Sequence, residues 1–371
     1  MILIILLLFT TLIPTNSNEF IIGGYLPEYR FYIDLPSTVA KLNTITLFSL
    51  APNSDGSIKS FISEMDLKRF DQNDQTDAKI AIAVGGGGRS AAFPAISNDG
   101  ALRRRFVASL SEFMAVHPYI TGIDFDWESP SSVQEASSYI RLIAEVRAKL
   151  GNSVTLSVAL HPDQFLPSYD ALDFVHLMTY DMRNPAGHAQ FNDVVAAVNN
   201  FVVSGCPREK ILLGIPLYGR DNVGGVATYS EIVDMAIDDN EELNVSERLP
   251  TNWRTTDMTA SGIVYDGIQS AQRKAQWAIE NKLAGIFFWE LGQDKNEEHV
   301  SIVSAVRDVV EKGDRLTKSQ MASKINEPRE SLVKTATHED VGSRRSRRKK
   351  KKQEKAAAKK RIRNKIKEVE L

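Results

Sequence analysis

The stretch that decides the fold is TGIDFDWE, from Thr121 to Glu128, in which acidic and large apolar residues alternate. Because successive side chains of a β-strand point to opposite faces, Asp124, Asp126 and Glu128 share one face, and three large apolar residues share the other. Carboxyl groups on one face lie roughly 6–7 Å apart, and like charges that close disfavour joint ionisation, so we expect at least one to stay protonated near neutral pH. A protonated carboxyl group at a strand end suits general acid catalysis.

Two other interpretations of this strand are open at this point. An alternating strand at the edge of a sheet can simply expose its acids to water. An Asp-x-Asp pair is also a common ligand set for a hard cation. The rest of the chain decides among the three.

Length and composition indicate one large domain with a tail. The chain has 371 residues, and an α/β barrel uses about 250 residues as a single unit. A hydrophobic content of 43% and a charged content of 25% are typical of a soluble globular protein with ample material for a core. Of the net charge of −2, residues 343–371 contribute +12, from 15 Lys/Arg and 3 Asp/Glu, which leaves −14 for the rest. The body is acidic and the tail is strongly basic.

The N-terminal residues predict a signal peptide. The segment MILIILLLFTTLIPTNS, residues 1–17, is an apolar run of about a dozen residues ended by Pro14, too short to cross a bilayer. We expect cleavage near Ser17 and entry into the secretory pathway, hence a secreted protein. The alternative is a buried N-terminal strand.

The chain has a single cysteine and a single glycosylation sequon. Cys206 excludes an intrachain disulfide and is interpreted as a structural thiol. The sequon NVS begins at Asn244, in a polar stretch typical of a surface loop.

Eight strand-like segments alternate with stretches of helical spacing. They lie at residues 20–29, 44–52, 79–88, 121–128, 154–160, 174–182, 211–220 and 284–294. Eight such units predict an α/β fold of the (β/α)8 TIM-barrel class, in which active sites lie at the C-terminal strand ends. The predicted strand ends carry polar and aromatic residues, namely Tyr25, Asp124, Asp126, Glu128, Tyr180, Asp181, Tyr218, Arg220, Trp289 and Glu290.

A closed barrel weakens the two competing interpretations. It has no edge strand, and the other strand ends do not supply an obvious further set of metal ligands. His161 and His176 lie near strands but lack a ligand spacing such as i, i+4, so we expect them to be core or surface residues. The glycines at 85–88 match neither a P-loop nor a dinucleotide fingerprint, and close backbone packing is their expected use. We therefore predict no cofactor and no metal.

Five segments, taken in order, resemble glycoside hydrolase family 18, the chitinase family. They are VGG (84–86), GIDFDWE (122–128), MTYD (178–181), GIPLYGR (214–220) and GIFFWELGQD (285–294). The resemblance covers about residues 20–310. It implies a barrel that hydrolyses β-1,4-linked N-acetylglucosamine by a substrate-assisted route, an exception to the two-carboxylate scheme of most glycosidases.

Roles follow from the resemblance residue by residue. Glu128 matches the general acid that later acts as the base, Asp126 would hold the acetamido N–H, and Asp124 would share a proton with Asp126. Tyr180 would bond the acetamido oxygen, and Trp289 would stack under a sugar ring. The resemblance also places around the substrate Tyr25, Gly86, Met178, Asp181, Tyr218 and Arg220.

Three departures from the family pattern affect these expectations. Thr121 stands where the family's first aspartate is expected, and Ala83 replaces a serine that supports the inner aspartate, so we expect a weaker relay between Asp124 and Asp126. The insertion at residues 221–267, between strands seven and eight, is short. A short insertion predicts a shallow groove and endo-type cleavage.

The resulting hypothesis divides the chain into a signal peptide at 1–17, the barrel at 18–313 and a disordered Lys/Arg-rich tail at 314–371. The function expected is that of an endo-acting chitinase acting on chitin or chitooligosaccharides. A lectin-like member without turnover and an endo-β-N-acetylglucosaminidase are the alternatives. The tail composition cannot build a core, and we expect it to be solvated, to act as a nuclear localisation signal, or to bind anionic polymers or surfaces. No integral membrane span is expected.

Overall fold

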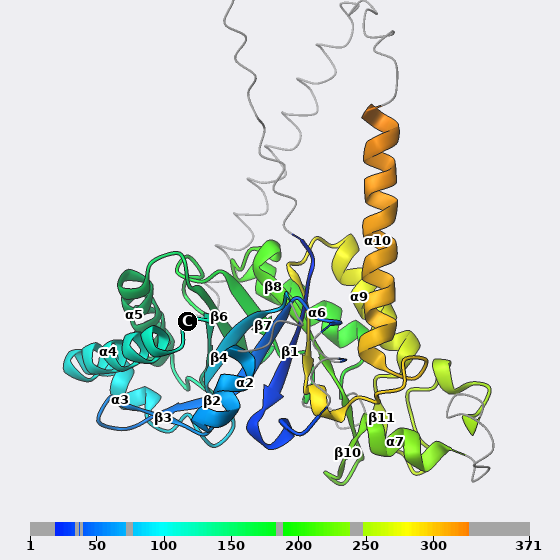
Figure 1. Cartoon of the computed structure of the whole chain (residues 1–371), viewed down its shortest axis with the longest axis horizontal. Helices are drawn as coiled ribbons and strands as arrows, with labels where there is room; N and C mark the ends of the chain where they lie inside the picture. Colours follow the sequence, from blue (N-terminus) through cyan, green and yellow to red (C-terminus); the bar gives the residue numbers. More distant parts are fainter. Residues whose placement is uncertain are drawn as a thin grey trace, which may run out of the picture. The chain divides into compact units, whose positions relative to one another are not determined.

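Eight parallel strands close into a barrel, as predicted (Figure 1). The computed structural model describes residues 19–33, 37, 40–71, 77–182, 188–237 and 248–325. Each barrel strand pairs in parallel with its neighbours, and the pairing of the first strand with the second closes the ring. The strands are β1 (Ile21–Pro27), β2 (Thr44–Pro52), β4 (Lys79–Gly85), β5 (Ile120–Asp126), β6 (Thr155–Leu160), β7 (Phe174–Leu177), β8 (Ile211–Pro216) and β12 (Gly285–Trp289).

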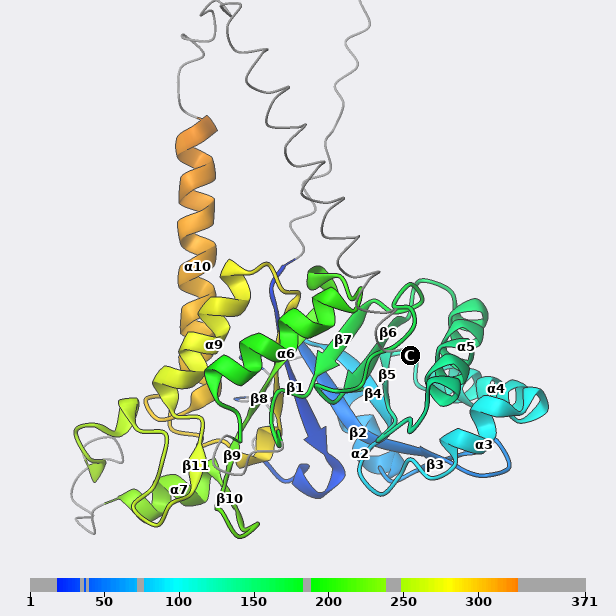
Figure 2. The ribbon, with the colours of Figure 1, turned by 180° about the vertical axis from the view of Figure 1, so that it is seen from behind.

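Besides the strands, the described residues form helices, most of which lie around the outside of the barrel (Figures 1 and 2). They are α2 (Glu64–Asp71), α3 (Phe93–Asn98), α4 (Gly100–Val116), α5 (Val133–Leu150), α6 (Phe191–Val203), α7 (Tyr229–Ala236), α9 (Ile268–Glu280) and α10 (Ile302–Ile325). Short 3-10 turns are η1 (Glu28–Arg30), η3 (Arg208–Lys210), η4 (Trp253–Thr255) and η5 (Leu291–Gln293). Ser132 caps α5: its hydroxyl accepts a hydrogen bond from Glu135 N at 3.1 Å.

One link departs from the predicted alternation of strands and helices. Residues 161–173, between β6 and β7, form turns and no helix. Pro162 and Pro167 lie in this link, and a proline inside a helix removes a hydrogen bond and clashes with the preceding turn. Most of the predicted strands are also shorter in the structure. The segment 174–182 is a strand only as far as Leu177, and 211–220 is divided into β8 and β9 (Tyr218–Arg220).

Strand alternation divides the core into two clusters. The outward face of β5 belongs to the large cluster between barrel and helices, where Trp127 stacks on Phe93 at 5.4 Å and meets Tyr139 edge-on at 5.1 Å. A second, smaller cluster lies in the barrel interior and includes Tyr25 and Phe287. The inward face of β5 carries the acids, so the polar row lies inside the barrel.

The insertion between β8 and β12 is a small antiparallel sheet. Its strands run in the order β10 (Val226–Thr228), β9, β11 (Val264–Tyr265), with α7 beside them. A further hairpin strand, β3 (Ile58–Ser60), pairs antiparallel with β2. The insertion is short, as predicted.

Several sequence predictions fall outside the described residues. The signal peptide (1–17), the sequon at Asn244 and residues 326–371 of the tail are not described. The last helix continues to Ile325, beyond residue 313, at which we placed the end of the barrel domain. In the part of the chain that is described, no helix is long and apolar enough to cross a membrane.

Cys206 is buried and carries a free thiol, in agreement with a structural role. Burial raises the pKa of its thiol to about 12. A thiol with that pKa is inert near neutral pH.

Candidate functional site

The three acids of β5 form a row of increasing exposure. Asp124 is 0% exposed, Asp126 is 3% exposed, and Glu128 reaches solvent beyond the strand end. Every second side chain of β5 points into the barrel, and each successive one lies nearer the C-terminal end of the barrel, where the interior opens to solvent. Glu128 is therefore the outermost acid, as expected.

Asp124 is held by three side chains from three strands. Its Oδ2 accepts a hydrogen bond from the Tyr25 hydroxyl of β1 at 2.6 Å. Its Oδ1 accepts from the Ser157 hydroxyl of β6 at 2.6 Å and lies 3.2 Å from His176 Nδ1 of β7. The expectation that the relay is weakened at Ala83 overlooked these partners: Ala83 is paired with Asp124 in the strand register and offers no hydroxyl, but Ser157 does.

Asp126 is nearly buried and incompletely bonded. Burial, the Glu128 carboxylate and the Asp124 carboxylate raise its pKa well above the ordinary value. Its Oδ1 is buried and has no hydrogen-bond partner. Buried polar atoms are almost always bonded, so this oxygen points to a donor that the protein itself does not supply.

Glu128 also keeps its proton more firmly than a free glutamate. Desolvation raises its pKa, while a backbone hydrogen bond from Gly87 and the charge of His161 work in the opposite direction and Asp181 adds to the rise. Its backbone N–H donates to the Ser90 hydroxyl at 3.1 Å, which itself donates to Asp126 O at 3.0 Å. This pair of bonds fixes the chain where β5 ends.

An aromatic platform lies beside the acids. The half-buried ring of Trp289 contacts Tyr25 at 5.4 Å and Phe48 at 5.2 Å between centroids. Gly86 has a φ of +99°, and a Cβ there would lie 2.1 Å from the Phe48 ring. Gly86 thus permits the packing of the platform, and Met178 packs against the same interior cluster.

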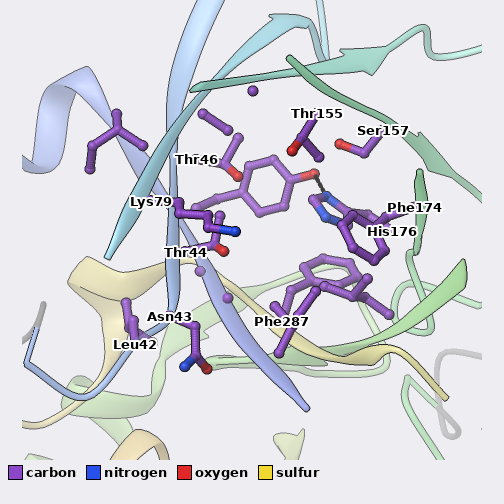
Figure 3. Close-up of a pocket in the computed structure, with 18 of the residues that line it drawn as sticks. Leu42, Asn43, Thr44, Thr46, Lys79, Thr155, Ser157, Phe174, His176 and Phe287 are labelled. Carbon is purple, nitrogen blue, oxygen red and sulfur yellow. Dashed lines mark hydrogen bonds between the residues drawn. The ribbon is translucent and has the colours of Figure 1, made fainter. Parts of the chain in front are cut away.

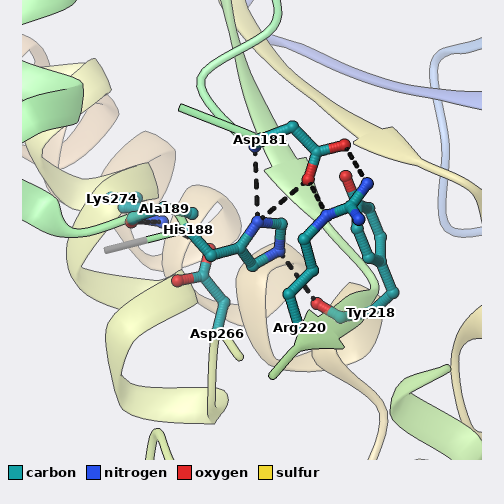
Figure 4. Close-up of polar contacts among 7 residues, drawn as sticks. All are labelled: Asp181, His188, Ala189, Tyr218, Arg220, Asp266 and Lys274. Carbon is teal, nitrogen blue, oxygen red and sulfur yellow. Dashed lines mark hydrogen bonds and ion pairs between the residues drawn. The ribbon is translucent and has the colours of Figure 1, made fainter. Parts of the chain in front are cut away.

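Asp181 is tied to Arg220 rather than free (Figure 4). Arg220 donates through Nε to Oδ1 and through Nη2 to Oδ2, the latter at 2.6 Å. Burial alone would raise the pKa of Asp181, but hydrogen bonds from His188, Arg220 and Tyr218 outweigh it and lower that pKa. Asp181 is therefore ionised, and its charge is neutralised within the protein.

Next to this pair, the buried side chain of His188 contacts the backbone of both Asp181 and Tyr218 of β9. Its Nδ1 lies 3.3 Å from Asp181 N and its Nε2 lies 3.3 Å from Tyr218 O. Next to it, Lys274 forms a buried ion pair with Asp266 and donates to Ala189 O at 2.5 Å (Figure 4).

The structure brings together the acids predicted from sequence and adds residues that the sequence reasoning missed. Tyr180, 6% exposed, packs on Tyr218 and Phe287, and its pKa is raised well above the ordinary value by burial and by Tyr218, Asp126 and Glu128. The missed residues are Phe48, Ser90, Ser157, His161 and His176. Strand parity could have found two of them, because Ser157 and His176 occupy inward positions of β6 and β7.

Thr121 is not part of the acid row. It lies on the opposite parity at the start of β5, roughly 20 Å from the mouth of the barrel, and donates to Ile80 O at 3.3 Å. Among the described residues, no group of three His, Cys, Asp or Glu side chains could hold a metal ion.

Two solved chitinases have a similar fold. A chitinase of Flavobacterium johnsoniae superposes with a TM-score of 0.66 at 22% identity, covering 79% of this chain and 94% of that one. A class V chitinase of Nicotiana tobaccum gives a TM-score of 0.63 at 20% identity, covering 79% and 99%. In fold, the protein is therefore a (β/α)8 barrel similar to these two structures.

The chain belongs to the glycosyl hydrolases family 18, whose sequence model matches residues 21–294. Chitinase 1 of Aphanocladium album is 28% identical over 264 residues, which are 58% of this chain and 62% of that protein. Chitinase 2 of Yersinia entomophaga is 25% identical over 289 residues, which are 58% and 45%. The chain thus matches less than two thirds of the length of these two relatives.

Proposed function

We propose that the protein is an endo-acting chitinase that hydrolyses β-1,4-N-acetylglucosamine linkages with retention, by a substrate-assisted mechanism. The observation that carries the proposal is the buried, unpartnered Oδ1 of Asp126, between a fully buried and an exposed carboxyl group. An acetamido N–H is a donor of the right kind for that oxygen. A mutant of a class V chitinase of Cycas revoluta has been solved in complex with (GlcNAc)3, which supports this ligand class.

In this mechanism Glu128 gives its proton to the glycosidic oxygen as the bond to the anomeric carbon breaks. The substrate's own acetamido carbonyl oxygen attacks that carbon, and Asp126 accepts the acetamido N–H, so that no enzyme nucleophile is required. Water then attacks the anomeric carbon, and Glu128 takes up the proton of that water and returns to its starting state. The raised pKa of Glu128 favours the protonated form that the first step needs.

The surrounding residues orient the sugar. The Tyr180 hydroxyl bonds the acetamido oxygen, and Trp289, supported by Tyr25 and Phe48, presents a ring face on which a pyranose stacks. The Asp181–Arg220 pair presents a neutral, hydrogen-bonding wall rather than a free charge. Such a wall suits an uncharged polysaccharide.

The test is release of the fluorophore from a chitooligosaccharide with a fluorogenic leaving group, assayed from pH 4 to 8, together with the lengths of the products formed from soluble chitin. We expect turnover and internal cleavage. Binding of the oligomer without turnover across the whole range would instead identify a lectin. Release from a glycoprotein N-glycan core but not from chitin would identify an endo-β-N-acetylglucosaminidase.

A further inference from the structure

A cavity lies inside the barrel on the side opposite the acids' mouth (Figure 3). Its volume is about 730 Å³, and it is lined by residues from the starts of the barrel strands. Several inward positions there are small, including Gly23, Ala81 and Gly122, whereas barrel interiors are usually filled by bulky side chains. The lining runs from exposed charged residues, Asp77 and Lys79 among them, to the buried inner end of the barrel.

The inner end of this cavity is the set of side chains that holds Asp124. Tyr25, Ser157 and His176 all line it, and each is within hydrogen-bond distance of the carboxylate. Figure 3 shows His176 and Ser157 facing the same space, with the Phe287 ring beside the imidazole. That ring is stacked on His176 at 5.0 Å and 29°. The imidazole is therefore held in one orientation between an aromatic ring and the polar network.

The contacts among Tyr25, Asp124 and His176 limit where protons can lie. Tyr25 Oη lies 2.6 Å from Asp124 Oδ2 and also 2.6 Å from His176 Nδ1, and a phenol has one hydrogen. If the phenol donates to an ionised Asp124, His176 Nδ1 must carry a proton and donate to the phenol oxygen. If Asp124 is protonated and donates to the phenol oxygen, the phenol donates to a bare Nδ1. The two arrangements differ by the net transfer of one proton from His176 to Asp124.

We propose that His176 is a positioning residue that shares one proton with Asp124 through the Tyr25 hydroxyl, and that the cavity connects this pair to water on the N-terminal side of the barrel. The inference rests on the proposed function. In the transfer, the Nδ1–H bond breaks as the phenol oxygen gains that proton, and the phenol's own proton passes to Asp124 Oδ2. The pair Asp124–/His176+ becomes neutral Asp124 and neutral His176 with no change in total charge.

Tyr25 can relay the proton because its own side chain stays protonated. Burial, followed by the charges of Asp124 and Asp126, raises its pKa well above the ordinary value, so it stays a phenol. The titratable and charged groups that face His176 are Asp124 and Tyr25 by contact, and across the cavity Glu19, Asp77, Lys79 and Arg307. Sharing a proton lets Asp124 change its charge as Asp126 engages the substrate, without a proton crossing the sugar site.

The test compares His176→Asn and His176→Phe with the unaltered protein. The amide N–H of the first variant can keep the bond to Tyr25 but cannot take up a proton, and the second keeps only the aromatic stacking. We expect kcat to fall at least about 10-fold in both, since misplacing a catalytic group costs up to about 100-fold, with KM changed less than about 2-fold and one limb of the pH profile displaced. The matched control is His117→Asn, a buried histidine outside the barrel interior, with an unchanged profile.

Melting temperatures of all variants establish that each is folded. A folded His176→Asn protein with normal kcat and an unmoved pH profile would show that His176 is only a hydrogen-bond donor, and the proposal would fail. A readout without substrate separates this failure from failure of the chitinase proposal. In 15N-histidine spectra of the protein, the Nδ1 signal of His176 should move when Asp124→Asn is introduced. An unmoved signal would overturn proton sharing whether or not chitin is cleaved.

Discussion

At the residue scale, the site depends on one acid being exposed and two being enclosed. Glu128 is the residue that contacts solvent and so the one that can reach a glycosidic oxygen. Replacing it by Glu128→Gln removes the transferable proton and leaves the shape of the side chain. We expect oligomer binding to be retained and kcat to fall at least about 100-fold, the scale of lost general acid catalysis. Titration calorimetry with a chitooligosaccharide and the fluorogenic assay measure the two quantities, and an unchanged rate would mean that Glu128 is misassigned.

The pH dependence of catalysis follows from the same carboxyl group. Because desolvation raises the pKa of Glu128, the acid form persists to higher pH than in a free glutamate. We expect a bell-shaped profile of kcat/KM whose basic limb lies above pH 4.5, the ordinary value for this side chain. Since Asp126 and Glu128 interact, Asp126→Asn should distort that limb. A profile of unaltered shape in this variant would show that the two carboxyl groups titrate independently.

The raised pKa of Asp126 also predicts how the stability of the protein depends on pH. Its pKa is raised in the folded state, so the native protein binds a proton that the unfolded chain has released, and the free energy of unfolding falls as pH rises above the ordinary aspartate value near 3.8. Asp126→Asn removes this cost. We expect the variant to gain melting temperature over the unaltered protein, and this gain to be larger at pH 8 than at pH 4. Each kcal/mol of additional free energy of unfolding raises the melting temperature by about 2–4 °C. The same difference at both pH values would contradict a raised pKa.

At the element scale, the C-terminal end of β4 packs closely against β5, and only a glycine fits there. Gly85 has a φ of +107°, and a Cβ there would lie 2.2 Å from Asp126 O. We expect Gly85→Ala to lower the free energy of unfolding by at least about 2 kcal/mol, through strain and the displacement of β5, and to reduce hydrolysis.

Gly88 provides the matched control for this substitution. It also has a positive φ, of +74°, but a Cβ added there would meet no atom within 4 Å. Gly88→Ala should therefore lower the free energy of unfolding by only about 1 kcal/mol, the cost of the left-handed conformation alone. Urea unfolding of both variants measures the two costs. Equal costs would mean that contact with β5 plays no part.

At the scale of the whole molecule, the chain combines an acidic body with a basic C-terminal segment, +12 over residues 343–371. We propose that this segment binds anionic polymers by counterion release, with an affinity that falls steeply as salt rises. Truncation after Glu330 should leave hydrolysis of a small soluble substrate unchanged and abolish retention on heparin at low salt. Equal retention of the truncated and full-length proteins would rule out the tail as the anchor.

Secretion remains a prediction at this scale, because it rests on residues 1–17 alone. Expression in a secreting host, followed by N-terminal sequencing of protein from the medium, tests it. We expect a mature chain that begins near residue 18. Retention of the intact N-terminus inside the cell would contradict the signal peptide.

The sequence by itself determined the barrel and the acid row. A strand period of two places Asp124, Asp126 and Glu128 on one face whatever surrounds them, and eight apolar segments separated by helical spacing have few ways to bury both faces. These features depend on neighbours in the chain, which the sequence shows directly.

Only the tertiary structure decided which partners the acids have. Tyr25, Ser157 and His176 come from three strands, at sequence separations of 99, 33 and 52 residues from Asp124, and meet because the barrel closes. Asp181, which follows β7, likewise meets Arg220 of β9, and the cavity lies behind the acids. A hydrogen bond depends on distances of a few tenths of an ångström and on desolvation by the whole fold, and neither is a property of any single segment.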